Sequence, residues 1–342
     1  MNRKTFFGIV LLLLAALPAR SQQQYDDEAD FSVRITGDGK AIEITGYTGT
    51  KTAVRIPPRI QSLPVTEIGN SAFRNKQLTS VVIPDSVTSI GLRSFADNKL
   101  RNLAIPGSVI TIGNNAFEKS EIENLTIGEG VTSIGFSAFY DNYIRSLIIP
   151  NSVTVLGSAA FSNNHLSSVT ISENVRVIES GVFVGNFLTS VVIPQGVTSI
   201  GFQAFRHNRL TSVTIPDSVT TIGAGAFIDN QLASITLPDS VTVIGRSAFR
   251  QNLLTGVTIP AGMTVIEFGS FAENKLASIV IPNNITFIET GAFADNQLTS
   301  VTIGANVALE PRGDVFDVGF DDFYRKNGSK AGTYLVNWVY RP

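Results

Sequence analysis

Few residues in this sequence are of the types that carry out chemistry on a substrate. The 342 residues include two histidines, His165 and His207, and no cysteine. The lack of cysteine excludes a cysteine nucleophile, a thiolate metal site and disulfides. The histidines lie 42 residues apart, and no cluster of carboxylates accompanies them. A catalytic triad or a metal site therefore has no set of residues to form it.

Acidic residues do not supply an alternative. Asp97, Asp141, Asp229 and Asp295 share one position of a sequence repeat and could form an acidic line, but other residue types interrupt them. A calcium site needs oxygen ligands that converge from several directions, so a solvated surface is the stronger interpretation. No glycine-rich phosphate loop joins a strand to a long helix. We therefore expect a protein that is not an enzyme and that binds no cofactor and no metal.

The side chains best suited to binding are aromatic and cationic, and such side chains are common at the energetic centres of protein interfaces. Tyr143, His165, Phe187 and Arg209 share one position in successive repeats, and Tyr140 and Arg206 lie close by in the sequence. If equivalent positions stack, these six residues form one patch on the rim of the molecule, which is the candidate partner-binding site: Tyr140, Tyr143, His165, Phe187, Arg206 and Arg209. The alternative interpretation is ordinary variation at exposed positions.

One spacing organises the whole chain and would bring these positions together. Self-similarity at a fixed period is typical of a solenoid, in which each repeat forms one coil stacked on the next. We therefore expect one elongated domain, although the length alone would suggest two or more. A phenylalanine returns every 22 residues, eleven times without a slip: Phe73, Phe95, Phe117, Phe139, Phe161, Phe183, Phe205, Phe227, Phe249, Phe271 and Phe293.

The unit from Leu210 to Gln231, LTSVTIPDSVTTIGAGAFIDNQ, illustrates one coil. Its LxxVxI segment has β-branched residues two apart, which predicts a strand with alternate side chains pointing inward. The proline that follows ends the strand. A turn, a second extended piece and a single tight helical turn then complete the coil. We expect the strands to run along one face of the solenoid, with short turns behind.

An asparagine lies three places after the anchor phenylalanine in nine of the eleven repeats. A buried side-chain amide at this place can bond backbone groups of its own coil and of the neighbouring coil. Lys76 and Ser120 interrupt this column, and we expect their coils to be less well satisfied. Another column holds Phe136, Phe202 and Phe268 at intervals of 66 residues, and for these we expect a packing role.

The order LxxVxIPxxVxxIGxxAFxxN resembles the repeat of the BspA-like bacterial leucine-rich repeat proteins over roughly residues 54 to 307. Many members have a cysteine in the asparagine column and a unit one residue longer, so the turn into the strand should be tighter here. The segment from Phe323 onward also resembles the end segment of such arrays. The resemblance implies an exported surface protein involved in adhesion to host or neighbouring cells.

We assign the fold to the α/β, mainly β, class, as a curved right-handed leucine-rich repeat solenoid of about eleven to twelve 22-residue repeats with terminal caps. The expected divisions are a signal peptide over residues 1–21, an N-terminal capping hairpin over 22–52, the solenoid over 53–310 and a C-terminal cap over 311–342. A basic start, an apolar run and a small-x-small end predict the signal peptide. An uncleaved anchor is the alternative, but its apolar run is shorter than the ~20 residues that span a bilayer.

Charge narrows the choice of partner. Residues 1–21 hold three basic residues and no acid, so the mature chain carries 23 basic and 28 acidic residues. No basic stripe of the kind that nucleic acid requires is present. We therefore expect no nucleic-acid partner and no small-molecule substrate, and the partner should be an extracellular or cell-surface protein bound by a monomer.

The leading hypothesis is a secreted or cell-surface leucine-rich repeat binding protein, adhesin-like, that recognises a host or bacterial macromolecule through its extended repeat surface. We expect an exported, extracellular or cell-surface location, with the periplasm as an alternative. The alternative function is a self-associating structural or envelope protein without a dedicated ligand, which would pair through exposed strand edges at the ends of the solenoid.

Overall fold

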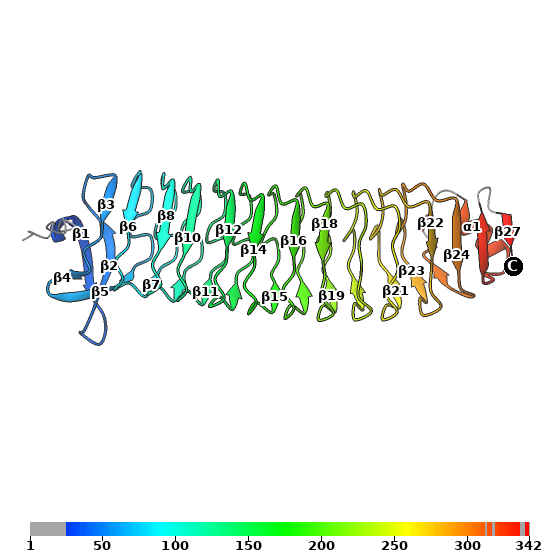
Figure 1. Ribbon diagram of the computed structural model, residues 1–342, viewed down its shortest axis with the longest axis horizontal. Coiled ribbons are helices and arrows are strands. Elements are labelled where there is room, and N and C mark those ends of the chain that lie inside the picture. Colours follow the sequence, from blue (N-terminus) through cyan, green and yellow to red (C-terminus); the bar gives the residue numbers. More distant parts are fainter. Residues whose placement is uncertain (1–24, 312, 317–318, 336–338, 342) are drawn as a thin grey trace, which may run out of the picture.

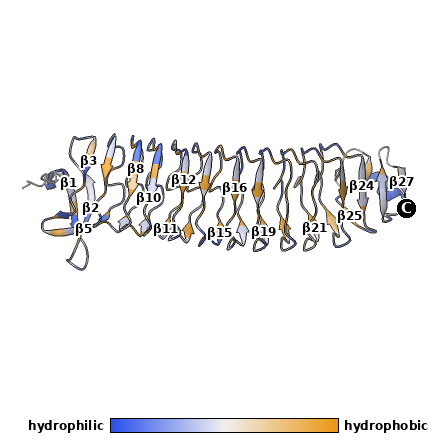
Figure 2. Ribbon diagram, in the orientation of Figure 1, coloured by the Kyte–Doolittle hydropathy of each residue, from blue (hydrophilic) through white to orange (hydrophobic). Residues whose placement is uncertain are grey.

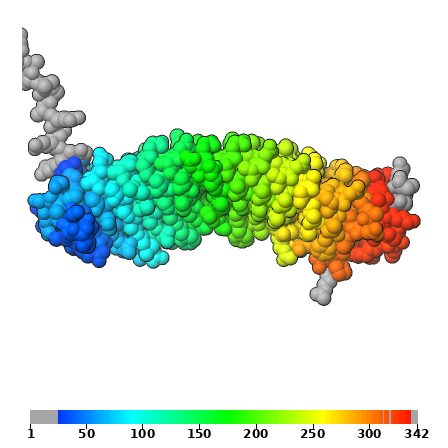
Figure 3. Space-filling view, turned by 90° about the horizontal axis from the view of Figure 1, so that it is seen from below, coloured from blue at the N-terminus to red at the C-terminus, as the bar shows by residue number. Residues whose placement is uncertain are grey.

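The computed structural model describes residues 25–311, 313–316, 319–335 and 339–341. The expected signal peptide, residues 1–21, lies outside this range. The described chain winds into short coils stacked along one axis, and they make an elongated body (Figure 1) that bows gently in the space-filling view (Figure 3). This architecture is a mainly β solenoid of 22-residue repeats with very little helix, as the spacing of the phenylalanines predicts.

Most coils contribute a first strand from the LxxVxI segment, and alternate residues of this strand face the core. The equivalent residues 234–237 and 256–259 form no strand. Neighbouring first strands pair in parallel two by two, β3 with β6, β8 with β10, β12 with β14, β16 with β18 and β22 with β24. The first strands are β3 (Ala53–Arg55), β6 (Ser80–Val82), β8 (Asn102–Ile105), β10 (Asn124–Ile127), β12 (Ser146–Ile148), β14 (Ser168–Thr170), β16 (Ser190–Val192), β18 (Ser212–Thr214), β22 (Ser278–Val280) and β24 (Ser300–Ile303).

The second extended piece of each coil also forms a strand, so the expectation of strands along one face was incomplete. These strands build a second parallel ladder, visible below the first in Figure 1. They are β5 (Leu63–Ile68), β7 (Ser89–Ile90), β9 (Thr111–Ile112), β11 (Ser133–Ile134), β13 (Val155–Leu156), β15 (Val177–Ile178), β17 (Ser199–Ile200), β19 (Thr221–Ile222), β20 (Val243–Ile244), β21 (Val265–Ile266), β23 (Phe287–Ile288) and β25 (Ala308–Leu309).

The anchor phenylalanines are fully buried and stack on one another through the length of the body. Consecutive rings lie about 5 Å apart, for example 5.3 Å between the centroids of Phe117 and Phe139 with 4° between the planes. The stack continues beyond the eleven regular anchors. Tyr47 packs on Phe73 at one end and Phe316 packs on Phe293 at the other. Hydrophobic residues accordingly recur in coil after coil in Figure 2.

The asparagine column bonds the backbone of two coils at once, as predicted. The side-chain amide of Asn186 donates to the carbonyl of Phe183 in its own coil and to that of Phe161 in the preceding coil. Its carbonyl oxygen accepts from the Leu166 amide at 3.0 Å. A buried polar group with partners on both sides holds adjacent coils in register.

The expectation that the coil of Ser120 is poorly satisfied is wrong. The Ser120 hydroxyl is buried and donates to the Phe95 carbonyl at 2.8 Å, the bond that an asparagine amide would make. The backbone carbonyl of Ser120 accepts from the Leu100 amide at 2.7 Å, in place of the amide oxygen. The serine hydroxyl thus replaces the asparagine NH₂ group, and the backbone carbonyl of the same residue replaces the asparagine side-chain oxygen.

A glycine follows the second strand of most coils, where neighbouring backbones approach most closely. A Cβ at Gly157 would lie 2.6 Å from backbone of the preceding coil, inside van der Waals contact. Glu179 and Glu267 occupy this column, and at these two coils the second ladder is interrupted between β13 and β15 and between β20 and β21. The bond from the Gly201 amide to the Ile178 carbonyl, 2.7 Å, has no counterpart at either glutamate within the described chain.

We call these interruptions the first joint (β13 to β15) and the second joint (β20 to β21). At the first joint the rings of Phe161 and Phe183 are 6.3 Å apart, the widest spacing between consecutive anchors. Glu289 also stands in the glycine column but follows Glu267 rather than a glycine, and its amide keeps the bond to Ile266 at 2.9 Å. The joints therefore form where a glutamate first meets a coil that ends in glycine.

An antiparallel hairpin occupies the N-terminal end of the solenoid. It consists of β1 (Phe31–Ile35) and β2 (Ile42–Tyr47), follows the short helix η1 (Glu28–Asp30), and pairs in parallel with β5 through β2. The strand β4 (Arg59–Ile60) pairs antiparallel with β5. Asp26 closes the open edge of β3, because its amide donates to the Arg55 carbonyl and its carboxylate accepts from the Arg55 amide.

The C-terminal end is covered by the helix α1 (Phe320–Lys326) and a hairpin of β26 (Gly332–Leu335) and β27 (Val339–Arg341). This hairpin adds to the first ladder, with β26 antiparallel to β24. Tyr334 is buried against the aromatic residues of this end.

Candidate binding surface

Four of the six candidate residues form a continuous stack on the surface. Tyr143 and His165 have ring centroids 5.2 Å apart, and His165 and Phe187 are 5.4 Å apart. The guanidinium carbon of Arg209 lies 4.4 Å from the centre of the Phe187 ring. We call these four residues the aromatic ridge. The predicted stacking of equivalent positions therefore occurs, with one member from each of four successive coils.

The backbone fixes the direction of each side chain in the aromatic ridge. Each residue comes directly after a buried asparagine of the asparagine column and directly before a buried leucine or isoleucine, so it points outward. Its amide donates to the preceding coil, as the Phe187 amide does to the Leu166 carbonyl at 2.9 Å. Tyr143 is 45% exposed and Phe187 is 39% exposed. The aromatic ridge is thus pre-positioned, with large apolar groups open to solvent.

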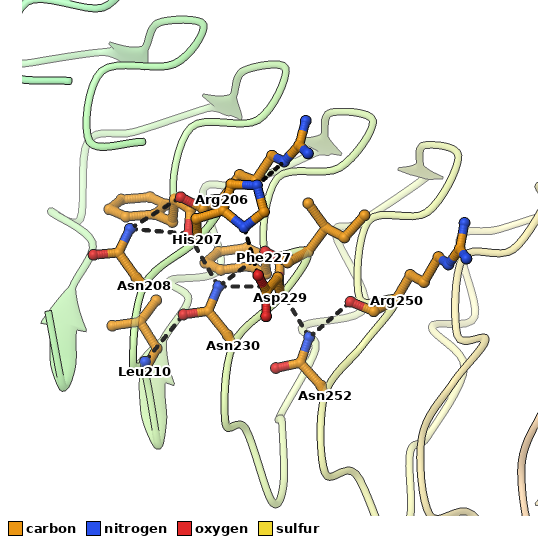
Figure 4. Close-up of polar contacts among 11 residues, drawn as sticks. Arg206, His207, Asn208, Leu210, Phe227, Asp229, Asn230, Arg250 and Asn252 are labelled. Atoms are coloured by element: carbon orange, nitrogen blue, oxygen red, sulfur yellow. Dashed lines mark hydrogen bonds and ion pairs between the residues drawn. The ribbon is translucent and has the colours of Figure 1, made fainter. Parts of the chain in front are cut away.

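The other two candidates, Tyr140 and Arg206, lie in an adjoining row and have separate partners. The Tyr140 hydroxyl accepts from the side-chain amide of Asn163 at 3.1 Å. Arg206 donates from Nε to Nε2 of His207 at 2.9 Å, and Nδ1 of His207 bonds Asp229 (Figure 4). The structure therefore places them beside the aromatic ridge but outside its stack.

Both ring nitrogens of His207 have partners in this arrangement. Nε2 accepts from Arg206, and Nδ1 bonds the Asp229 carboxylate. His165 is 42 residues away in sequence and belongs to the aromatic ridge, so the two histidines do not form a common site.

The aspartates of the suspected acidic line have a structural role. Asp97, Asp141, Asp229 and Asp295 all have a left-handed backbone, with φ between 56° and 60°. Aspartate, asparagine and glycine tolerate this conformation better than other residues, which accounts for the column.

Two further kinds of site are absent from the described residues. No group of three or more metal-ligating side chains occurs in the described part of the chain. Likewise, no helix there is long and apolar enough to span a bilayer.

Phe136, Phe202 and Phe268 are more exposed than the expected packing role requires, at 51%, 53% and 43%. They lie three coils apart and do not touch one another in the described contacts.

Hollows on the strand faces are gaps between coils. One of them, about 440 Å³, lies between residues 256–259, which form no strand, and β22. Its lining residues carry no charge, so it offers nothing that would orient a polar ligand.

Comparison with known proteins now identifies the class. The family model for the BspA type leucine-rich repeat region matches residues 66–188 and 177–300, more than half of the chain. The protein belongs to this family of bacterial leucine-rich repeat proteins, which supports a role in protein interaction through the repeats. A search of curated proteins gives no match.

Two solved structures are similar to this chain. A leucine-rich repeat protein from Bacteroides ovatus is 21% identical, with a TM-score of 0.61, and the match covers 84% of this chain and 89% of that one. A leucine rich cell surface protein from Faecalibacterium prausnitzii is 26% identical, with a TM-score of 0.49, and the match covers 83% and 89%. The first of these shows that the coil architecture is shared.

Proposed function

We propose that this protein is an exported, adhesin-like binding protein that holds an extracellular or cell-surface protein on its repeats without chemical change. The observation that carries the proposal is the aromatic ridge. Tyr143, His165, Phe187 and Arg209 are exposed, stacked and fixed by the backbone. A rigid row of aromatic and arginine side chains loses little conformational freedom on binding, which favours affinity.

Membership of the family supports a protein-binding function in general terms, because its repeats serve protein interaction. The apolar run at the start of the sequence supports export. The alternative, self-association through strand edges, is less favoured. The hairpins β1–β2 and β26–β27 add antiparallel strands at the two ends, and Asp26 closes the edge of β3. End-to-end pairing of coils would have to displace these segments.

Measurements of location and of binding test the proposal. Cell fractionation and protease treatment of intact cells locate the chain, and biolayer interferometry measures binding of residues 22–342 to a panel of extracellular-matrix and serum proteins. We expect a protease-accessible surface protein that binds saturably as a monomer. A chain that binds nothing in the panel, and whose mass by light scattering grows with concentration, would support the self-associating alternative instead.

A further inference from the structure

The arginines at and beside the aromatic ridge have no acidic partner among the described residues. Arg145 and Arg209 form no ion pair there, and Arg206 bonds His207. Arg74, Arg246 and Arg250, in contrast, each pair with a carboxylate of another coil. Arg93 and Arg176 also form no ion pair with a described residue, but they lie in other columns of the repeat. Unpaired guanidinium groups beside exposed rings can bind a carboxylate of another molecule in bidentate fashion.

The turns that carry the aromatic ridge hold more basic than acidic side chains. Residues 139–145, 161–167, 183–189 and 205–211 contain three arginines, both histidines and one acid, Asp141, whereas the whole chain has a formal net charge of −2. The charge at the aromatic ridge is therefore complementary to an anionic partner.

Within the stack, the rings cover one another and leave their edges to solvent. His165 lies between Tyr143 and Phe187, and Phe187 lies between His165 and Arg209. Sugar rings bind aromatic residues by stacking on an open face, and the two central rings have none. A peptide side chain can pack on ring edges, and its backbone can follow the row of coils. This geometry favours a peptide over an anionic glycan.

From these observations we infer that the aromatic ridge binds an acidic, extended peptide segment of the partner protein. Its carboxylates would pair with Arg209, Arg145 and Arg206, and an apolar side chain between them would pack on Phe187. Four coils at about 4.8 Å per coil correspond to about five extended residues. The inference rests on the proposed function, since it names the chemistry of the partner at that site.

The test begins with random peptides displayed on phage and selected on the purified protein. We expect the selected sequences to be enriched in aspartate and glutamate around an apolar residue. The consensus peptide is then measured by fluorescence polarisation. Arg209→Gln should weaken its binding about tenfold, and added salt should weaken it further. Lys275→Gln is the matched control because Lys275 has the same position three coils beyond Arg209, and it should leave affinity unchanged.

The outcomes separate this inference from the proposed function. Selected peptides without acidic residues, or equal losses in Arg209→Gln and Lys275→Gln, would overturn the inference. So would binding of a heparin fragment that depends on Arg209 when no acidic peptide is selected, because the site would then serve a glycan. If the protein binds an extracellular protein that the acidic peptide does not displace, the proposed function stands and the inference fails. If no extracellular protein binds, the proposed function itself fails.

Discussion

Arg209 places its guanidinium carbon 4.4 Å from the centre of the Phe187 ring, across a gap of one coil and 22 residues of sequence. This contact ends a stack that begins at Tyr143, and it leaves the guanidinium without an acidic partner among the described residues. The same contact joins two properties of the surface, since the ring supplies apolar area and the arginine supplies charge.

Loss of an anchor ring should be costly, whereas loss of an exposed ring should not. Phe183→Ala removes a fully buried side chain from the central stack and should lower the free energy of unfolding by about 3–5 kcal/mol. Phe187→Ala, four residues later, removes a ring that is 39% exposed and should cost less than about 1.5 kcal/mol. Urea denaturation followed by circular dichroism measures both. Similar losses for the two variants would contradict the assignment of the anchor column as the core.

The asparagine ladder predicts a graded response at Asn186. Asn186→Ala leaves the buried Leu166 amide without its partner, which should cost about 1–3 kcal/mol. It also removes one of the two side-chain bonds to the Phe161 carbonyl, which keeps the bond from Asn164. Asn186→Ser should cost less, because a serine hydroxyl can reach the carbonyl, as Ser120 does for Phe95. Thermal denaturation of the two variants tests the order. An equal loss of stability would show that the hydroxyl does not replace the amide at this coil.

A glycine at position 179 should restore strand pairing at the first joint. Glu179→Gly removes the side chain that separates β13 from β15 and should allow the Val177 and Ile178 segment to pair with the preceding coil. We expect slower hydrogen exchange of the amides in β15. Gly223→Glu is the converse change, because it follows Gly201 and a Cβ there would lie 2.7 Å from the Gly201 backbone, and it should speed exchange in β19. Unchanged exchange in both variants would mean that the glutamates do not cause the interruptions.

The C-terminal cap should be more stable in mild acid than at neutral pH. Burial raises the pKa of Asp321 from 3.8 to about 6, against the lowering effects of the Val315 amide and Arg325. Because the folded pKa is the higher one, stability from the protonated carboxyl is complete below about pH 4 and is lost as the pH rises through about 6. Hydrogen exchange of α1 across this range measures the effect.

Asp321→Asn provides the control for that measurement. The amide cannot ionise, so the stability of the cap should lose its dependence on pH in this window. Asp322→Asn serves as the matched exposed variant and should keep the dependence, since Asp322 lies on the solvent side of the same helix. If the variant with asparagine at position 321 keeps the full dependence, another group is responsible.

Much of the fold could be predicted because the repeat is so regular. The 22-residue interval between phenylalanines determines which residues stack, and this is why the neighbours Tyr143, His165 and Phe187 could be predicted. Stacking followed from the period, whereas the tilt of the rings and the contact of Arg209 depend on rotamers that a period does not specify. The unpaired state of Arg209 likewise depends on three-dimensional neighbours.

Other features could not be predicted from the sequence because they depart from the 22-residue period. Phe316 follows Phe293 by 23 residues and Tyr47 precedes Phe73 by 26, so neither fits the repeat, yet both extend the buried stack. The joints are marked in the sequence, since Glu179 and Glu267 each follow a run of glycines in one column of the repeat. That a glutamate there interrupts strand pairing could not be predicted, because it depends on how closely neighbouring backbones approach.

The measurement that tests the account most directly is binding of the exported chain to its extracellular partner with the aromatic ridge altered. Tyr143→Ala with Phe187→Ala removes two exposed rings from the aromatic ridge. Phe136→Ala with Phe202→Ala removes two comparably exposed rings from a different column. We predict that the first pair weakens binding at least tenfold, about 1.4 kcal/mol, while the second pair leaves it unchanged and both pairs keep their stability. Unchanged binding by a stable first pair, or equal losses in both pairs, would contradict the assignment of the aromatic ridge as the binding site.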